Sequence, residues 1–493
     1  MLTPYGAMLE AHALAQPAHP AVAMPGVEIG YPELIHRVRH CAAQLARDDI
    51  GYAGPAGVSI ADDLSNLVTS LALLVLGVPQ IALPTSDPPA MRRELARRLS
   101  LAHVIVDDGS EGIDGIDTVA IGPGSLDDST PASPVVPVLV DPEAPALYAT
   151  SSGTTGQSKL IAFSQRLVGV RARQIALTQD FAPDERVMVT LPVATQLGKI
   201  ARLNALWCGA TAILPAGPSS PALSLPDLCA SLRVTYLQMT VLQARNLLLK
   251  SEGGERLPAF TRVFLGAARM PPGLPREFES RVGGRVYDRY GSTEANLIAT
   301  TWPAGDEGVP DAVGRLAPGT IVEIVDETGA PCPPDTIGEV RVRAEAMVDG
   351  YVDDPVATSL QFRDGWFHPG DMGSITRTGV LRFLGRKDDM MVLNGINIFP
   401  AEIERVLEEH SAVRNAAAFP IRSPIYGDIP AAAVELNGTM GVDVPALSAY
   451  ARERLGVRAP RKVVIVAALP RNANGKVLKR ELAAALAQGR TGG

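Results

Sequence analysis

The sequence has 493 residues, of which 46% are hydrophobic and 20% charged, and its formal net charge is −8. A chain of this length exceeds one ordinary hydrophobic core, so we expect more than one domain. The acidic balance and the dispersed lysines and arginines exclude a basic surface for nucleic acid, and the composition favours a soluble globular protein.

The sequence shows no pattern of a targeting signal, and this and the spacing of the cysteines favour the cytoplasm. The four cysteines lie far apart and lack metal-ligand spacing, so we expect neither a zinc site nor a disulfide framework. The first residues do not combine a basic segment with an apolar core, as a signal peptide would. The longest apolar run, 67–78, is shorter than the ~20 residues of a spanning helix. We therefore predict a cytoplasmic protein without a membrane span.

In the first two thirds of the chain, helical and strand-like segments alternate. Helices are expected at 31–46 and 66–76, and short apolar strands at 57–60, 80–83, 186–190, 210–214, 234–238 and 262–265. This alternation is typical of open, mostly parallel sheets covered by helices.

From about residue 313 the pattern changes to short strands and turns, at 321–325, 339–342 and 380–384. A last α/β unit follows, with helices at 400–409 and 444–455 and strands at 415–419 and 462–466. The polar segment 385–389 is a predicted linker. The fold class is therefore α/β: a large N-terminal domain, 1–385, with stacked, mostly parallel sheets and a β-rich subdomain, and a small α+β C-terminal domain, 386–493.

A segment rich in glycine and small hydroxyl residues follows the predicted strand 146–149. A phosphate chain must approach the backbone closely, so such residues supply unobstructed N–H and O–H donors while a lysine supplies charge. The spacing matches neither a P-loop nor a dinucleotide-binding fingerprint, and composition alone also fits a flexible linker. The residues in question are Ser151, Ser152, Gly153, Thr154, Thr155, Gly156 and Lys159.

This segment resembles the signature of the adenylate-forming superfamily, which includes acyl- and aryl-CoA synthetases, nonribosomal peptide adenylation domains and firefly luciferase. Further matching segments follow in the same order, at 290–294, 365–371, 385–389 and 474–476. The chain is most similar to the acyl- or aryl-CoA ligases. This resemblance implies an AMP-forming acid–thiol ligase, which converts ATP and a carboxylic acid to an acyl-adenylate and pyrophosphate and then passes the acyl group to coenzyme A.

The resemblance also implies the catalytic residues. The attacking carboxylate and the ATP phosphates are all anions, so the site needs a metal ion and cationic side chains. Glu294 would hold Mg²⁺, Thr155 and Lys159 would act on the phosphates, and Lys476 would bridge the substrate carboxylate and the α-phosphate. Other residues implied for ATP and AMP binding are Ser151, Ser152, Gly153, Thr154, Gly156, Asp288, Arg289, Tyr290, Gly291, Ser292, Thr293, Asp371 and Arg386.

Three of these residues have a specific implied contact. Tyr290 would lie against the adenine, and Arg386 would contact ribose or phosphate. Asp371 would accept hydrogen bonds from the ribose hydroxyls, since a carboxylate accepts two side by side. The resemblance further implies that Asp388 is the hinge of a mobile C-terminal domain and that Gly395 and Asn397 lie near the tunnel for coenzyme A.

The acyl pocket departs most from the family pattern. Its implied residues are Thr195, Gln196, Gly198, Lys199, Met239, Gly266, Ala267 and Ala268. Thr195 stands where many members have histidine, and Ala267 replaces a glycine. Lys199 and Arg202 lie three residues apart, on one face of a predicted helix, where they could meet a second anionic group of the acid. Solvent exposure or contact with coenzyme A is the alternative for both.

Other functions stay open at this point. A stand-alone enzyme could load the acyl group onto a carrier-protein phosphopantetheine instead of coenzyme A. An amino-acid substrate is disfavoured because segment 193–198 lacks an aspartate to pair with an ammonium group. Glu294, Asp371 and Lys476 together argue against an adenylate-binding sensor without catalysis. Both a monomer and a homodimer fit, and the sequence does not identify the acid.

Overall fold

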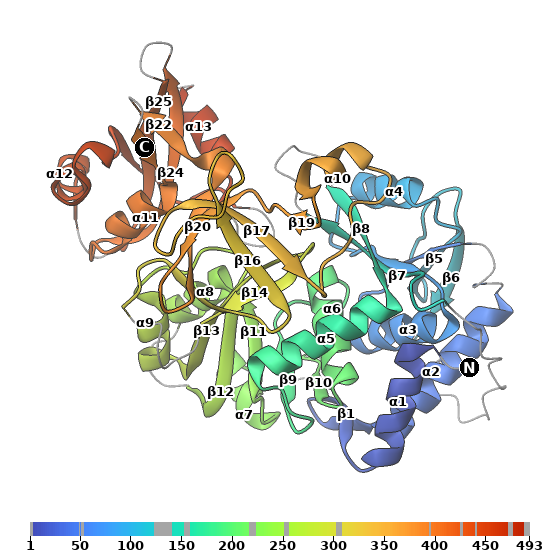
Figure 1. Ribbon diagram of the computed structural model, residues 1–493. Helices are drawn as coiled ribbons and strands as arrows, with labels where there is room; N and C mark the ends of the chain where they lie inside the picture. Colours follow the sequence, from blue (N-terminus) through green and yellow to red (C-terminus); the bar gives the residue numbers. More distant parts are fainter. Residues whose placement is uncertain are drawn as a thin grey trace.

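The computed structural model describes residues 3–48, 50, 54–122, 141–151, 158–215, 223–250, 256–301, 308–393, 396–423, 427–438, 441–471 and 477–487. In Figure 1 a small C-terminal domain lies at the upper left, and the larger part of the chain lies below and to the right.

A six-stranded sheet forms the right-hand part of this view. Its order is β6-β5-β3-β4-β7-β8, and its strands are parallel except for the β7–β8 pair. Helix α3 is almost wholly buried, which explains the long apolar run in its sequence. The elements are β3 (Ala56–Ser59), α3 (Asp63–Leu76), β4 (Gln80–Ala82), α4 (Pro89–Arg98), β5 (His103–Asp107), β6 (Asp117–Ile121), β7 (Pro145–Ser151) and β8 (Lys159–Ser164).

A 15-stranded sheet runs through the centre of the molecule, in the order β18-β19-β17-β20-β21-β15-β14-β13-β12-β11-β9-β10-β1-β2, with β16 paired to β17. Its pairs from β1 and β10 through to β12 and β13 are parallel, and its pairs beyond β13 are antiparallel. Strand β13 thus joins a parallel half to an antiparallel half, which is the β-rich subdomain expected from the sequence. That subdomain begins at β14, earlier than residue 313.

The parallel half and its helices comprise α1 (Pro4–Ala15), β1 (Pro20–Met24), β2 (Val27–Gly30), α2 (Tyr31–Arg47), α5 (Gln165–Gln179), β9 (Arg186–Val189), α6 (Gln196–Trp207), β10 (Thr211–Ile213), α7 (Leu225–Ser231), β11 (Tyr236–Thr240), α8 (Val241–Lys250), β12 (Leu257–Gly266), α9 (Leu274–Arg281) and β13 (Gly283–Ser292). The antiparallel half comprises β14 (Asn296–Thr300), β15 (Ala312–Leu316), β16 (Thr320–Val325), β17 (Gly338–Ala344), α10 (Pro355–Gln361), β18 (Phe362–Arg363), β19 (Trp366–Phe367), β20 (Asp371–Ile375) and β21 (Val380–Arg386).

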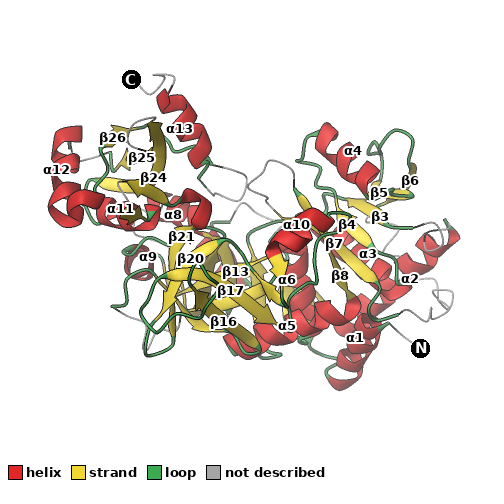
Figure 2. Cartoon of the chain, turned by 45° about the horizontal axis from the view of Figure 1, so that its top comes forward, coloured by secondary structure: helices red, strands yellow, loops and turns green. Residues whose placement is uncertain are grey.

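One hydrophobic core joins the two sheets. Helices α5 and α6 lie between them (Figures 1 and 2), and the core includes Val58 of the smaller sheet, Phe163 of β8, Leu206 of α6 and Phe264 of β12. The two sheets and the helices between them therefore pack as layers around shared apolar contacts.

The C-terminal domain has its own five-stranded sheet, in the order β23-β22-β25-β24 with β26 on β25, and its own apolar clusters. Its elements are β22 (Met391–Leu393), β23 (Ile396–Ile398), α11 (Pro400–Glu408), β24 (Val413–Ser423), β25 (Gly427–Leu436), α12 (Val444–Leu455), β26 (Lys462–Ile465) and α13 (Lys479–Ala487). The predicted linker is only partly irregular, because Gly385 and Arg386 end β21 and Lys387–Asp389 form a 3-10 turn.

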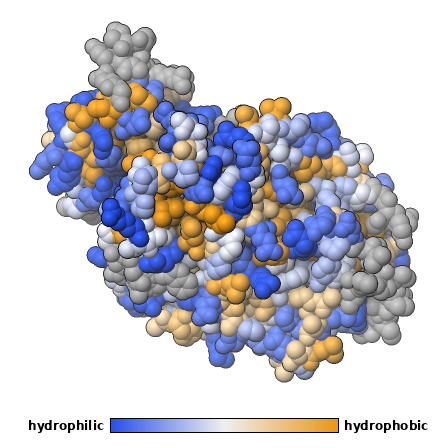
Figure 3. All heavy atoms as spheres, viewed as in Figure 1, coloured by the Kyte–Doolittle hydropathy of each residue, from blue (hydrophilic) through white to orange (hydrophobic). Residues whose placement is uncertain are grey.

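The observed elements confirm the predicted α/β class, with a large multi-sheet part and a small α+β part. Among the described residues, no helix combines the length and apolar character needed to cross a membrane. None of the four cysteines forms a disulfide. The face shown in Figure 3 is largely hydrophilic, with small groups of hydrophobic residues between the polar ones.

Candidate active site

A buried carboxylate, Glu294, lies in the turn between β13 and β14. Its side chain is 8% exposed and accepts a hydrogen bond of 2.9 Å from the Tyr351 hydroxyl. The buried Arg171 fixes the turn by donating to the carbonyls of Glu294 and Ala346, each at 2.9 Å. Burial lowers the pKa of Arg171 to about 9, an effect that the Glu294 charge opposes. The turn thus holds one carboxylate in a fixed position that is largely buried from solvent.

Lys159 lies beside this carboxylate. Its Nζ donates to Gln361 Oε1 at 2.7 Å and stands 4.5 Å from the centre of the Tyr351 ring. Burial lowers the pKa of Lys159, while the charges of Glu294 and Asp354 oppose that shift. Lys159 begins β8 and pairs across the sheet with Ser151, the last residue of β7. The glycine-rich loop therefore starts and ends close to Glu294.

A second group of side chains contains Tyr290, Asp371 and Arg386. The Tyr290 hydroxyl donates to Asp371 Oδ2 at 2.5 Å, and Arg386 donates to Asp371 Oδ1 at 3.0 Å. Asp371 and Arg386 are register partners in β20 and β21, whereas Tyr290 comes from β13. Burial, and then the Asp371 charge, raises the pKa of Tyr290 well above its ordinary value. Three residues that the sequence separates widely are thus in direct contact.

The end of β12 lies next to β13 at this site. Register pairs Leu265 with Asp288, and a side chain at Gly266 would meet the backbone oxygen of Arg289 at 3.4 Å. Burial raises the pKa of Asp288 to about 7, while the backbone N–H of Arg289 and the charge of Arg269 oppose the shift. Ala267 has a φ of 68°, in the left-handed region where glycine is favoured. This conformation fits the glycine that the family pattern expects there.

The first turn of helix α6 contains a glycine, Gly198, that no other residue can replace. Thr195 caps the helix by accepting from the Gly198 N–H at 3.2 Å and donates to the Pro192 carbonyl at 2.8 Å. A Cβ on Gly198 would stand 2.0 Å from the Pro192 carbonyl oxygen, so only glycine fits. Thr195 is therefore a helix cap, which explains how the threonine is accommodated where many members have histidine.

Lys199 and Arg202 lie on one helical face, as the spacing predicts, but that face is buried. Lys199 is 1% exposed and hydrogen-bonds Gln80 Oε1 at 3.3 Å, and burial lowers its pKa to about 7. Arg202 is 0% exposed and donates to three backbone carbonyls, those of Val189, Leu191 and Gly198. The expectation that both side chains reach solvent or coenzyme A is wrong, because tertiary packing covers the face they share.

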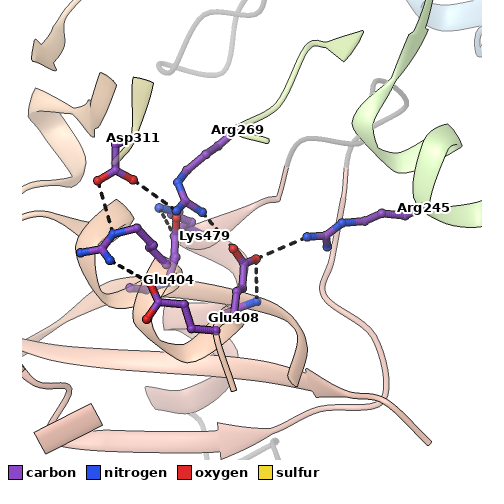
Figure 4. Close-up of polar contacts among 10 residues, drawn as sticks. Arg245, Arg269, Asp311, Glu404, Glu408 and Lys479 are labelled. Carbon is purple, nitrogen blue, oxygen red and sulfur yellow. Dashed lines mark hydrogen bonds and ion pairs between the residues drawn. The ribbon is translucent and has the colours of Figure 1, made fainter. Parts of the chain in front are cut away.

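The C-terminal domain contacts the large part of the chain through ion pairs (Figure 4). Glu408 of α11 pairs with Arg269 at 3.0 Å and with Arg245 at 3.5 Å, and Arg269 also pairs with Asp311. Within the C-terminal domain, Glu404 pairs with Lys479 at 2.7 Å. Arg269 follows β12, so these ion pairs connect α11 of the small domain to the end of that strand.

Comparisons with known proteins agree with this geometry. A model of the AMP-binding enzyme family matches residues 9–352, and the model of its C-terminal domain matches residues 402–476. The chain belongs to the AMP-binding enzyme family. This membership confirms the predicted class, an ATP-dependent acid–thiol ligase of the AMP-forming type.

Individual relatives support the same class. The chain is 31% identical over 357 residues to sulfoacetate–CoA ligase of Cupriavidus necator, covering 71% of this chain and 69% of that protein. It is 35% identical to 2-succinylbenzoate–CoA ligase of Geobacillus kaustophilus over 249 residues, 50% of each chain. The crystal structure of ATP-bound MatB from Rhodopseudomonas palustris superposes with a TM-score of 0.87 at 25% identity, covering 99% of this chain and 100% of that one.

The structure brings together many of the residues that the sequence predicts for the site of this AMP-binding enzyme. Ser152, Gly153, Thr154, Thr155, Gly156, Gly395 and Lys476 lie outside the described residues. Asp388 is exposed in the 3-10 turn after β21, and Asn397 lies in β23. Met239 packs in an apolar core, apart from any polar group of the site.

Sequence reasoning missed Tyr351, Gln361 and Arg171, which position Glu294 and Lys159. No motif spacing links them, because they lie on α5 and around α10, 57 or more positions from Glu294. It also missed the residues of α6 that line an internal cavity beside Arg289, since the sequence does not reveal which helix face borders a cavity.

Proposed function

We propose that this enzyme adenylates a small carboxylic acid at the site between β12, β13 and β20 and then transfers the acyl group to coenzyme A. The observation that carries the proposal is the contact of Tyr290 and Arg386 with the Asp371 carboxylate, beside the buried Glu294 and the half-buried Lys159. The group around Asp371 suits a nucleoside, and the group around Glu294 suits its phosphates. A single nucleotide would therefore span both groups.

The residues around Glu294 fit a magnesium ion. Mg²⁺ is usually held by one or two carboxylates together with substrate phosphates, and it keeps several waters. Glu294 offers one buried carboxylate, with its Oε1 already fixed by Tyr351. When bound, the ion would neutralise phosphate charge as the carboxylate attacks. Lys159 would contact the phosphate chain from the other side.

We infer that the chain works as two domains, 1–385 and 386–493, with Asp388 as the hinge. Support comes from the separate sheet and apolar clusters beyond Met391 and from the exposed turn that contains Asp388. Hinge residues commonly lie in such short exposed segments. The C-terminal domain would carry Lys476 toward the acid in the first half-reaction and present the segment around Asn397 to coenzyme A in the second.

The acceptor and the acid stay proposals. The printed names of relatives include ligases for sulfoacetate, 2-succinylbenzoate, oxalate and indoleacetate, all joined to coenzyme A. These names favour coenzyme A over a carrier protein, but their acids differ widely in size and charge. A cytoplasmic location and a monomeric or homodimeric state remain predictions from the sequence.

A two-step assay tests the proposal. Acid-dependent exchange of labelled pyrophosphate into ATP, measured over a panel of acids, reports adenylation. Thioester formation is then measured with coenzyme A and, separately, with a phosphopantetheinylated carrier protein. We expect exchange with at least one short acid and product only with coenzyme A. Exchange without thioester on coenzyme A would favour the carrier protein, and no exchange with any acid would refute the function.

A further inference from the structure

A partly open cavity of about 60 Å³ lies between helices α5 and α6 and the face of the parallel strands β9, β11 and β13. Its walls include Ile175 of α5, Leu197 and Ile200 of α6, and the polar side chains of Asn204, Gln238 and Arg289. The volume accommodates a few water molecules, so a bound group must be small.

Three polar side chains of this cavity have no partner within the described ranges, whereas Asn296 and Tyr236, which also line it, are hydrogen-bonded to Gln174 and Gln179. Among the residues that the structure describes, no hydrogen bond or ion pair reaches the side chains of Arg289, Asn204 or Gln238, although Asn204 is 8% and Gln238 9% exposed. Buried polar groups in native proteins are almost always hydrogen-bonded, and an arginine stays charged inside a protein. An anion that entered the cavity would therefore relieve an unfavourable arrangement.

Arg289 points away from the nucleotide side of β13. Successive side chains of a strand alternate between its two faces, so Arg289 and Tyr290 lie on opposite faces. Tyr290 reaches Asp371, whereas Arg289 shares its face with Tyr287 and Gln238, which neighbour the stacked rings of Tyr236 and Phe264. Arg289 is thus next to the adenylate position along the chain but directed toward the cavity.

We propose that Arg289 binds a second anionic group, a carboxylate or sulfonate, at the far end of the substrate acid. This inference rests on the proposed function, because it places the reacting carboxylate at the Tyr290 side of β13. The acid is therefore short and doubly charged, with Asn204 and Gln238 adding hydrogen bonds and Ile175, Leu197 and Ile200 enclosing its carbon chain. Lys199 and Arg202, which the sequence offered for this role, are occupied elsewhere.

Equilibrium binding tests this assignment without relying on turnover. Malonate, succinate and glutarate are titrated calorimetrically into the enzyme with α,β-methylene-ATP present, and propionate, butyrate and valerate serve as chain-length matches. We expect one dicarboxylate to bind at least about 100-fold more tightly than its match, since a site built for a charged group rejects the analogue that lacks it. If no dicarboxylate binds more tightly than its match, the assignment is wrong.

Variants then locate the effect. Arg289→Met should remove about 100-fold of the dicarboxylate affinity and leave monocarboxylate binding unchanged, while Arg289→Lys retains part of the preference. Arg285→Met, on the same strand but exposed, is the matched control and should change nothing. Equal losses for both acid classes in Arg289→Met would mean that Arg289 holds the reacting carboxylate or ATP, and would overturn the proposal. Selective binding without pyrophosphate exchange would refute the function but not the subsite.

Discussion

Lys199 is a buried amine, and no acidic residue in the described part of the chain forms an ion pair with it. Its one hydrogen bond, to the Gln80 side chain, does not compensate the desolvation that lowers its pKa to about 7. Its folded-state pKa lies below the ordinary lysine value, so the unfolded chain binds more protons between the two values. The destabilisation is fully present below pH 7 and disappears as the pH rises toward about 10.

We therefore expect Lys199→Met to stabilise the protein near pH 7. The difference in free energy of unfolding between this variant and the wild type should shrink as pH rises, by up to about 1.4 kcal/mol per pH unit. Urea unfolding of both proteins between pH 6 and pH 10 measures that difference. Lys462→Met, at an exposed position of β26, is the control and should show no such trend. A difference that is independent of pH would contradict the assigned burial.

At the scale of elements, α6 shows what sequence patterns do and do not predict. The spacing of Lys199 and Arg202 correctly indicated one helical face, and Gly198 and Thr195 fit the start of the helix. The pattern did not predict that this face is buried, because the burial depends on how α6 packs against β9 and against β4, which lies more than 100 residues earlier in the chain. Local periodicity determines which residues share a face, and tertiary packing determines what the face contacts.

Arg202 should respond to substitution in the opposite sense to Lys199. It satisfies three carbonyls at the end of β9 and the start of α6, and the nearby Asp63 accepts from the Val193 N–H at 2.8 Å. Arg202→Met leaves those carbonyls unpaired and should lower the free energy of unfolding by about 3 kcal/mol or more. Urea unfolding of the variant and the wild type measures this change in the free energy of unfolding. If Lys199→Met destabilises the protein by a similar amount, the predicted contrast between Lys199 and Arg202 is wrong.

The distinction between local pattern and tertiary packing also applies to the active site. Motif order alone placed Glu294, Asp371, Tyr290 and Arg386 in one site, and the structure brings them into two adjacent groups. Tyr351 was not predictable, since its hydroxyl meets Glu294 only after β13 and the segment before α10 fold together. The cavity at Arg289 escaped prediction for the same reason, because its walls come from α5, α6, β9, β11, β13 and β14, which are separate parts of the chain.

For the whole molecule, the ion pairs of Figure 4 favour one orientation of the C-terminal domain. Glu408 is 7% exposed and pairs with both Arg245 and Arg269. Removing one member of a buried pair costs several kcal/mol, because the partner is left without compensation. If the domain turns between the two half-reactions, weakening these pairs shifts the balance between its orientations.

Glu408→Gln should therefore change the two half-reactions unequally. The ratio of pyrophosphate-exchange rate to thioester-formation rate is expected to move at least about fivefold, which is about 1 kcal/mol of relative stability. Glutamine keeps the acceptor for the Ala416 N–H, so folding of α11 is preserved. Glu409→Gln, at the exposed position directly after the same helix, is the control. A ratio that stays within twofold of wild type would show that the pairs do not select an orientation.

The central claim is that the acid becomes an adenylate, and isotope transfer tests it most directly. In that reaction a carboxylate oxygen attacks the α-phosphorus and expels pyrophosphate; the thiolate of coenzyme A then attacks the carbonyl carbon and expels AMP, which keeps the oxygen. With an acid whose carboxylate carries two ¹⁸O atoms, we predict one ¹⁸O in AMP for each thioester formed. Label in inorganic phosphate together with ADP, or AMP without label, would contradict the account.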